Sequence, residues 1–228
     1  MKDNIYSKPV RHLVAVDCVI FGYEDDELKV LLFLRALEPM RGQWSLVGGW
    51  INEEESVEGA ANRVLHAITG LENIYLEQVG VFSKPGRDPG GNVISIVFNA
   101  LIDIKKHNKD LVRAHGAHWW PIKELPELIF DHNDMVKKAL LQLQQEASYN
   151  IVGKELLPPE FTITQLRKLY NSIFLKEFDP GNFRKKILSL KILERLNKKD
   201  VSESKKGAYY YRFIENKDSF AGERIVKL

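Results

Sequence analysis

A glycine-containing loop that leads into a short helix constrains this chain more than any other part of it. Residues 48–71 read GGWINEEESVEGAANRVLHAITGL. Ser56 is a suitable N-cap and Gly70 a suitable C-cap, so the segment predicts a helix that ends at about Thr69. Residues three and four positions apart share one face of a helix. On that face the chain carries three apolar residues: Val64, Ala67 and Ile68.

The spacing of this segment resembles the Nudix box, G-x5-E-x7-R-E-U-x-E-E-x-G-U, in which U is a bulky aliphatic residue. The positions that match are Gly49, Glu55, Arg63, Leu65, Gly70 and Leu71. The other three family glutamates fall on the apolar face just described. In Nudix hydrolases those carboxylates hold metal ions that polarise a pyrophosphate and activate water. The resemblance therefore implies the family's fold without its metal chemistry. We expect that the protein is not an enzyme and that it has no catalytic residue, no metal site and no cofactor.

Two alternatives remain open for this segment. It could match by chance as an ordinary loop entering an ordinary helix, or the chain could be a hydrolase whose metal site has moved. Glu53, Glu54 and Glu58 lie nearby, although not at the helical spacing of the family. Glu55 and Arg63, eight residues apart, are interpreted as a structural ion pair that holds the loop.

Charge is distributed unevenly along the 228 residues, although the formal net charge is only +2. Residues 161–228 carry 16 Lys and Arg against 8 Asp and Glu, whereas residues 1–160 carry 17 against 23. A basic module on an acidic body indicates a polyanionic partner for the module. A solvated basic surface without a partner is the alternative on charge alone.

The chain shows no sign of membrane insertion or secretion. It contains no apolar run near the length that spans a bilayer, and its first residues lack the apolar core of a signal peptide. Cys18 is the single cysteine, so no internal disulfide can form. We expect a cytoplasmic protein.

Hydrophobic patterning predicts an α+β protein of two domains. Expected strands cover 13–21, 28–34, 45–47, 74–82, 92–102 and 118–121, with a turn over 22–27. Residues 133–149 have the periodicity of an amphipathic helix. Residues 150–160 contain Gly153, Pro158 and Pro159 without periodicity. We therefore place a boundary there, with a ligand-sensing domain over 1–152 and a second domain over 153–228.

The second domain has the layout of a winged helix. Thr162 or Thr164 starts one helix, Asp179-Pro180 starts another, and residues 201–213 are interpreted as a hairpin. The second helix would enter the major groove of DNA and the hairpin would contact phosphate. The residues expected to bind DNA are Asn182, Arg184, Lys185, Lys186, Ser189, Lys205 and Lys206. A helical protein-interaction module is the alternative.

Together the two halves resemble the Nudix-related bacterial transcriptional regulators, in which an inactivated or weakened Nudix domain senses a ligand and a C-terminal winged helix binds an operator. Residues 86–95 (GRDPGGNVIS) and 119–126 (WWPIKELP) look like signatures of the ADP-ribose-type Nudix branch. Residues 182–186 (NFRKK) are similar to the family's DNA-reading helix. The resemblance covers nearly the whole chain. It implies a Nudix α/β/α sandwich with a C-terminal winged helix, and a homodimer that reads an inverted repeat.

Two branches of that family differ in their effector. One responds to L-arabinose and controls sugar use, and the other responds to ADP-ribose and controls NAD metabolism. Loss of the carboxylates, with Trp50 beside the glycines as an aromatic wall, favours the arabinose branch and a repressor of sugar utilisation. ADP-ribose remains the alternative, as do a hydrolase and a protein-binding adaptor. The residues expected to contact the ligand are Arg35, Trp50, Glu53, Arg87, Asp88 and Asn92.

Overall fold

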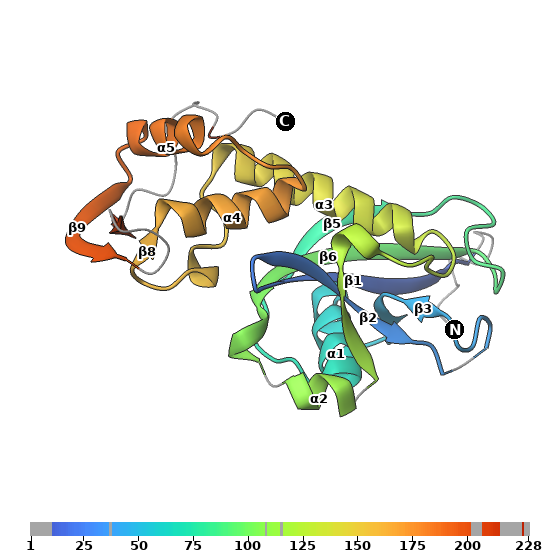
Figure 1. Cartoon of the computed structure of the whole chain (residues 1–228). Helices are drawn as coiled ribbons and strands as arrows, with labels where there is room; N and C mark the ends of the chain where they lie inside the picture. Colours follow the sequence, from blue (N-terminus) through green and yellow to red (C-terminus); the bar gives the residue numbers. More distant parts are fainter. Residues whose placement is uncertain are drawn as a thin grey trace.

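The computed structural model describes residues 11–36, 38–107, 109–114, 116–201, 207–214 and 225. Within them the chain forms a larger unit around a mixed β-sheet and a smaller helical unit with a three-stranded sheet (Figure 1). The two units lie side by side, and one long helix, α3 (His132–Tyr149), extends from the large sheet to the smaller unit.

The sheet of the larger unit is organised around two long central strands. β1 (Leu13–Glu24) and β6 (Val93–Asp103) run parallel, in register from Leu13 opposite Val93 to Tyr23 opposite Asp103. The main path of the sheet is β3-β2-β1-β6-β5. The other strands that complete it are β2 (Glu27–Leu34), β3 (Trp44–Ser45), β4 (Val47–Trp50), β5 (Glu77–Phe82) and β7 (Ala117–Pro121).

Helices cover both faces of this sheet, which confirms the predicted α/β/α sandwich. Alternate residues of a strand point to opposite faces. On β1, Val16 and Cys18 pack in the core on the α1 (Val57–Thr69) side, whereas Val19 and Phe21 pack in the core on the α3 side. Short elements complete the unit: α2 (Lys109–Ala114), η1 (Ile104–Lys106) and η2 (Ile122–Glu124). No helix of the described residues combines the length and the apolar character that crossing a membrane needs.

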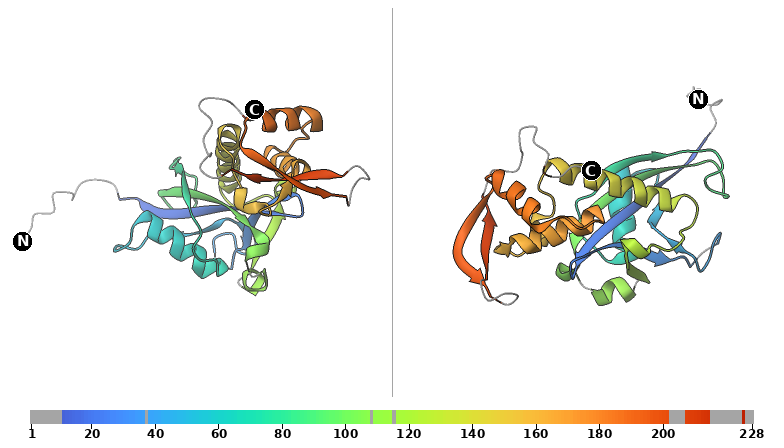
Figure 2. Two further views of the ribbon diagram at one scale, coloured as in Figure 1. Left: turned by 90° about the vertical axis from the view of Figure 1, so that its left-hand side faces the viewer. Right: turned by 45° about the horizontal axis from the view of Figure 1, so that its top comes forward.

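The smaller unit has the order of a winged helix: β8 (Phe161–Thr162), α4 (Ile163–Phe174), α5 (Pro180–Ser189), β9 (Leu193–Asp200) and β10 (Ala208–Phe213). Thr162 and Gln165 form a capping box at the start of α4, and Asp179 caps α5 by accepting from the Asn182 N–H. Figure 2 shows the β9–β10 hairpin as a ribbon projecting from the helices. The predicted winged helix is confirmed as a fold.

The two units share one apolar core. Leu143 and Ala147 of α3 belong to the same cluster as Leu166 and Tyr170 of α4. The Gln144 side chain donates from Nε2 to the Ile173 carbonyl over 2.9 Å. Because α3 packs on both the large sheet and α4, a displacement of this helix would change packing contacts in both units.

Three local expectations were wrong. The first turn is shorter than 22–27, because β1 continues to Glu24 and only Asp25 and Asp26 turn, both with positive φ. The glycine-containing loop expected from residue 48 starts later, because Gly48 and Gly49 lie in β4, paired with β1. The first strand of the wing is Leu193–Asp200, upstream of the predicted 201–213 hairpin, and charged residues hide it from a search for apolar runs.

Candidate functional site

The loop of the box is held by the expected ion pair. Arg63 donates from Nε to Glu55 Oε2 over 2.8 Å and from Nη2 to Glu55 Oε1 over 2.5 Å. The same Nη2 donates to the Trp50 carbonyl over 2.9 Å. The Arg63 hydrogen bonds lower the pKa of Glu55 to about 2. Glu55 is thus an anion tied to its neighbour, which fixes the loop between β4 and α1.

The metal that the resembled hydrolases use does not fit this helix. Val64 is 4% exposed and packs beneath β4, where a Cβ added to Gly49 would come within 2.9 Å of a Val64 methyl group. Ala67 and Ile68 offer no oxygen ligand either. Within the described part of the chain, no cluster of three or more His, Cys, Asp or Glu could hold a metal ion.

The opposite face of the sheet carries a row of polar and aromatic residues. Ala15 of β1 lies between Trp50 of β4 and Ser95 of β6, so these three share one face. Asp17, two residues further along β1, points the same way and lies opposite Gly48 of β4. Trp50 stands at the open end of this row with 53% of its surface exposed. An exposed indole next to buried polar groups can bind a flat or cyclic ligand.

Behind Trp50 lies a buried hydrogen-bond network at the start of α3. The Ser95 hydroxyl donates to Asp17, and His132 Nε2 lies 3.7 Å from the other oxygen of that carboxylate. His132 Nδ1 accepts from the Leu46 N–H over 3.2 Å, which leaves the ring proton on Nε2 toward Asp17. Burial lowers the pKa of His132. The imidazole is therefore neutral at pH 7.

Arg87 connects the loop before β6 to the start of α3. Its guanidinium is 4% exposed and binds Asp131 through two hydrogen bonds of 2.8 and 2.7 Å. Asp88 accepts from the Gly90 N–H over 2.6 Å within the same loop. These contacts place Arg87 in an ion pair rather than at an open position. Arg87 and Asp88 thus order the loop before β6, which borders the sheet face that carries Trp50 and Ser95.

The remaining predicted ligand residues surround this region. Arg35 follows β2, donates to the Pro39 carbonyl over 2.7 Å, and is near enough to His132 to influence its pKa. The carbonyl of Asn92 accepts from the Leu13 N–H, so Asn92 and Trp50 flank the first residues of β1 from either side. Glu53 is exposed in the loop after β4. Ligand contact by any of the six stays a prediction.

Sequence reasoning missed four polar residues of this face: the buried Asp17, Ser95 and His132, and Asp131, whose side chain is 21% exposed. One signal was available, because Asp17 is a carboxylate inside the apolar run LVAVDCVIF. A buried charge needs partners, and such partners mark a specific site more often than a core.

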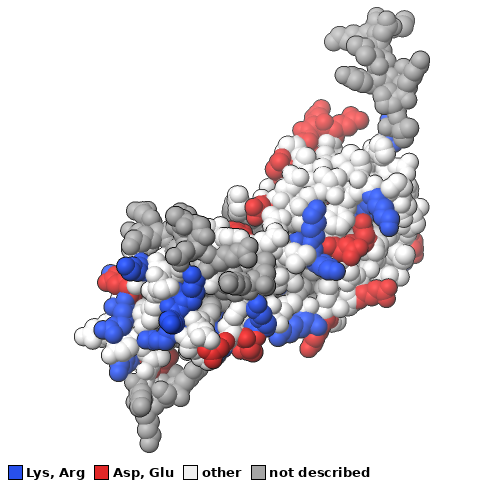
Figure 3. Space-filling model, turned by 90° about the horizontal axis from the view of Figure 1, so that it is seen from above, with Lys and Arg blue, Asp and Glu red and all other residues white. Residues whose placement is uncertain are grey.

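The candidate nucleic-acid interface is the outer face of α5. Phe183 and Ile187 are buried, whereas Asn182, Arg184, Lys185 and Ser189 are exposed and Lys186 is half-buried. Arg184 also donates to the Tyr211 hydroxyl over 3.3 Å, which links α5 to β10. Figure 3 shows Lys and Arg side chains gathered over the end of the molecule that carries this unit. An exposed helix face of this composition can contact base edges and phosphates.

The wing adds further cations, although Lys205 and Lys206 lie outside the described residues. Arg195 and Lys199 of β9 stack over the Tyr209 ring at 4.7 and 4.6 Å, and Lys198 lies 4.8 Å from the Tyr210 ring. Cation–aromatic contacts orient long side chains without neutralising them, although Lys198 also forms an ion pair with Glu160 over 2.7 Å. The strand that the sequence analysis missed is therefore itself basic and ordered.

An α/β/α sandwich with a Nudix-like box that lacks the metal-binding carboxylates, joined to a winged helix, defines the class: a Nudix-type domain followed by a C-terminal winged helix. The sequence model of the NUDIX domain matches residues 11–140, and that of the NrtR DNA-binding winged helix domain matches residues 153–213. The chain belongs to the Nudix family and carries an NrtR-type winged helix domain.

Three relatives extend this finding. The chain is 28% identical to the ADPR responsive transcriptional repressor NtrR of Acinetobacter baylyi, over 94% of this chain and 87% of that protein. It is 36% identical to the ADP-ribose pyrophosphatase of Methanocaldococcus jannaschii, over 60% of this chain and 76% of that enzyme. The third relative is Shewanella oneidensis NrtR, solved with a 27mer DNA, with TM-score 0.74, 28% identity, and 94% and 98% of the two chains covered. Its NUDIX domain was solved with ADP ribose, with TM-score 0.52, 32% identity, and 59% and 90% covered.

Proposed function

We propose that the protein is a DNA-binding transcriptional repressor whose Nudix domain binds ADP-ribose without hydrolysing it. The observation that carries the proposal is the apolar metal face of α1 combined with the exposed polar and basic face of α5. The first removes the ligands for catalysis, and the second supplies a surface for DNA. The domain boundary at residues 152 and 153 is part of this proposal.

ADP-ribose replaces L-arabinose as our preferred effector. Two relatives that match nearly the whole chain are a repressor named for its response to ADPR and a protein whose NUDIX domain was solved with ADP ribose. No comparison supports a pentose or a role in sugar utilisation. The ADP-ribose-type signatures at residues 86–95 and 119–126 are consistent with this choice.

The face of the sheet around Trp50 can recognise such a ligand without metal. The exposed indole suits stacking on the adenine ring, and the Arg35 guanidinium suits a phosphate oxygen. Asn92, Asp88 and Glu53 suit ribose hydroxyls because amide and carboxylate oxygens accept from them. Arg87 acts indirectly, by holding the loop through Asp131.

On the DNA side, α5 would lie in the major groove of a duplex and the β9–β10 wing beside the backbone. A single winged helix reads a short site, and a homodimer would read an inverted repeat with half-sites about 10 bp or a multiple apart. The exposed Asn182 and Lys185 are the proposed base-reading residues, with the other α5 residues and Lys205 and Lys206 near phosphate.

Communication between the two domains is proposed to run through α3. The start of this helix contacts the buried network of Asp17 and the Arg87–Asp131 pair, and its C-terminal half packs on α4. ADP-ribose must bind the DNA-competent and the DNA-incompetent arrangement with unequal affinity in order to act. A shift of α3 relative to the sheet would provide the two arrangements.

A rival function is hydrolysis with a rebuilt metal site, favoured by the 36% identity to a pyrophosphatase. One experiment separates the two. Binding sites are selected from a random duplex library with the full chain, and operator affinity is then measured with ADP-ribose, with L-arabinose and with neither. Release by intact ADP-ribose, with no hydrolysis product in Mg²⁺, supports the proposal. Hydrolysis without selection of any site would favour the enzyme, and neither DNA binding nor turnover would favour a protein-binding adaptor.

A further inference from the structure

A cavity of about 590 Å³ lies at the far end of β6 from Trp50, where the Nudix domain meets the segment that leads to the winged helix. It is lined by residues of β5, β6, α3 and η1 and by residues 73–75, 107, 151–153 and 155. Along β6, its residue Asn99 is four positions from Ser95, or about 13 Å at the rise of a strand. The cavity shares no lining residue with the face around Trp50, so it is separate from the proposed ADP-ribose site.

The floor of the cavity contains a polar group without a partner. Asn99 is 7% exposed, and its Nδ2 has no hydrogen-bond partner among the described residues. A buried donor that is left unpaired costs free energy, so native structures rarely retain one without a reason. A ligand atom with a lone pair, such as a carbonyl oxygen, would satisfy it.

Negative charge surrounds the opening. Glu77 of β5, Glu146 of α3 and Glu155 of η3 (Lys154–Leu156) come from three different elements, and Glu77 lies directly opposite Asn99 in the sheet. Burial, followed by the charges of Glu77 and Glu155, raises the pKa of Glu146. Glu146 therefore lies close enough to Glu77 and to Glu155 for both charges to act on it.

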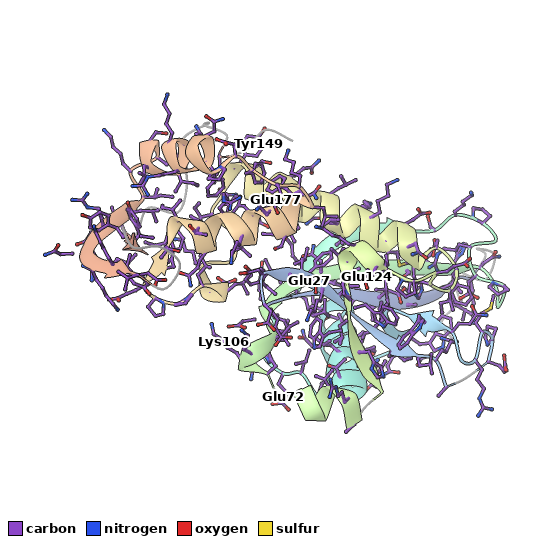
Figure 4. The ribbon with its side chains drawn as sticks, viewed as in Figure 1. Glu27, Glu72, Lys106, Glu124, Tyr149 and Glu177 are labelled. Atoms are coloured by element: carbon purple, nitrogen blue, oxygen red, sulfur yellow. The ribbon has the colours of Figure 1, made fainter. Side chains whose placement is uncertain are left out.

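The cations near the cavity do not neutralise these carboxylates. Lys106, on the side of the Nudix domain toward the winged helix (Figure 4), donates to the Glu155 carbonyl over 2.5 Å and lies 3.8 Å from Asp103. Burial lowers the pKa of His107, which keeps it neutral at pH 7. No Lys or Arg in the described ranges forms an ion pair with Glu77, Glu146 or Glu155. The described residues also include no cluster of three or more His, Cys, Asp or Glu that could hold a metal ion.

We propose that this cavity binds a small organic cation that carries a hydrogen-bond acceptor. The acceptor pairs with Asn99 Nδ2 at the floor, and the positive charge lies among Glu77, Glu146 and Glu155 at the rim. The apolar body contacts Leu143 and Val152 of the wall. Because Val152 belongs to the connection between the domains, an occupant would also contact the segment that positions the winged helix. The inference does not depend on ADP-ribose being the effector.

Calorimetry with the full chain and three probes of one skeleton tests the charge requirement. The probes are 4-(aminomethyl)benzamide, which is cationic, 4-(hydroxymethyl)benzamide, which is neutral, and 4-carboxybenzamide, which is anionic. We expect the cation to bind at least about tenfold more tightly than the neutral probe and the anion not to bind. ADP-ribose at saturation should leave these affinities measurable, because its proposed site is elsewhere.

Matched variants test the residues. Glu146→Gln and Asn99→Leu should each weaken binding of the cationic probe about tenfold. Glu124 is an exposed glutamate on η2 outside the cavity (Figure 4), so Glu124→Gln should leave this affinity unchanged. If Asn99→Leu does not fold, Glu77→Gln takes its place with the same expectation. Equal affinity for all three probes, no binding of the cation at millimolar concentration, or an equal loss in Glu124→Gln would overturn the proposal.

Discussion

Arg63 holds Glu55 by two parallel hydrogen bonds and holds the Trp50 carbonyl by a third. One guanidinium thus joins the first turns of α1 to the last residue of β4. The arrangement keeps the loop of the Nudix box ordered although the neighbouring metal face is apolar. In this chain the arginine and the first glutamate of the box have become structural residues, and the exposed Trp50 depends on them for its position.

The Glu55–Arg63 pair makes stability depend on pH in the acid range. Because the folded pKa of Glu55 is about 2, below its ordinary value of 4.5, its stabilisation is complete above about pH 4.5. It is lost as the pH falls toward 2. We expect Glu55→Gln to unfold at lower urea concentration than the parent chain at pH 7, with a difference that narrows between pH 4.5 and 2. A difference that stays constant over this range would show that the carboxylate charge is not the cause.

The parent chain should not hydrolyse ADP-ribose in Mg²⁺ or Mn²⁺, since Val64, Ala67 and Ile68 carry no ligand oxygen. A variant with Glu at all three positions should bind Mn²⁺ more tightly, as measured by electron paramagnetic resonance. It should also melt at a lower temperature, because a carboxylate at position 64 replaces a side chain that is 4% exposed. Product formation by the parent chain that disappears in Glu55→Gln would sink the prediction.

The fold could be anticipated from the sequence where local signals act alone. Ser56, Thr162 and Asp179 cap helices in the structure because each side chain accepts from a backbone N–H three residues on, a contact that neighbouring residues determine. The first strand of the wing was missed because LERLNKKD has few apolar residues. Its pairing is set by β10 across the hairpin, which a window along the chain does not detect.

The candidate site was harder to predict because its geometry comes from pairing between distant segments. Trp50 and Ser95 share a face only because β1 lies between their strands. Arg87 was expected to face a ligand, but Asp131, 44 residues away, binds it. Residue type alone did not distinguish an arginine that is available to phosphate from one that already has a carboxylate partner.

Substitutions on α5 should reduce operator affinity. Asn182→Ala and Lys185→Ala should each cost about 1–3 kcal/mol on the selected operator and relax specificity, if each makes a base contact. Lys205→Ala and Lys206→Ala should weaken all duplexes alike and flatten the dependence of affinity on salt. Fluorescence anisotropy measures both effects, and Lys123→Ala on η2 serves as the control. Unchanged operator affinity in all four α5 and wing variants would place the DNA surface elsewhere.

Trp50→Ala should weaken the binding of ADP-ribose by about 1–3 kcal/mol, the loss expected when a base no longer stacks on an aromatic ring. Affinity for the operator without ligand should not change, because Trp50 lies in the Nudix domain. Tyr75→Ala removes another exposed aromatic residue, 84% exposed, and is the matched control. Calorimetry with ADP-ribose and L-arabinose decides the effector. If L-arabinose gives heat of binding and ADP-ribose gives none, L-arabinose is the effector and the assignment to ADP-ribose is wrong.

The ion pair between Asp26 and Lys168 should influence the response of the DNA-binding domain to ligand. Lys168 of α4 lies 2.8 Å from Asp26 at the tip of the β1–β2 hairpin, which makes it a direct charged contact between the two domains. Both side chains are partly exposed, so their interaction should contribute no more than about 1 kcal/mol to stability. A contact of that size can still bias two arrangements that differ by a few kcal/mol.

We therefore expect Lys168→Met to leave the melting temperature nearly unchanged but to alter the ratio of operator affinities with and without ADP-ribose. The exchanged pair, Asp26→Lys with Lys168→Asp, should restore that ratio, and the double-mutant cycle isolates the interaction of the two charges. Tyr23→Phe is the necessary control, because the Tyr23 hydroxyl also donates to Asp26 over 3.2 Å. If the ratio is the same in Lys168→Met as in the parent chain, this contact has no part in the response, and transmission through α3 is left to account for it.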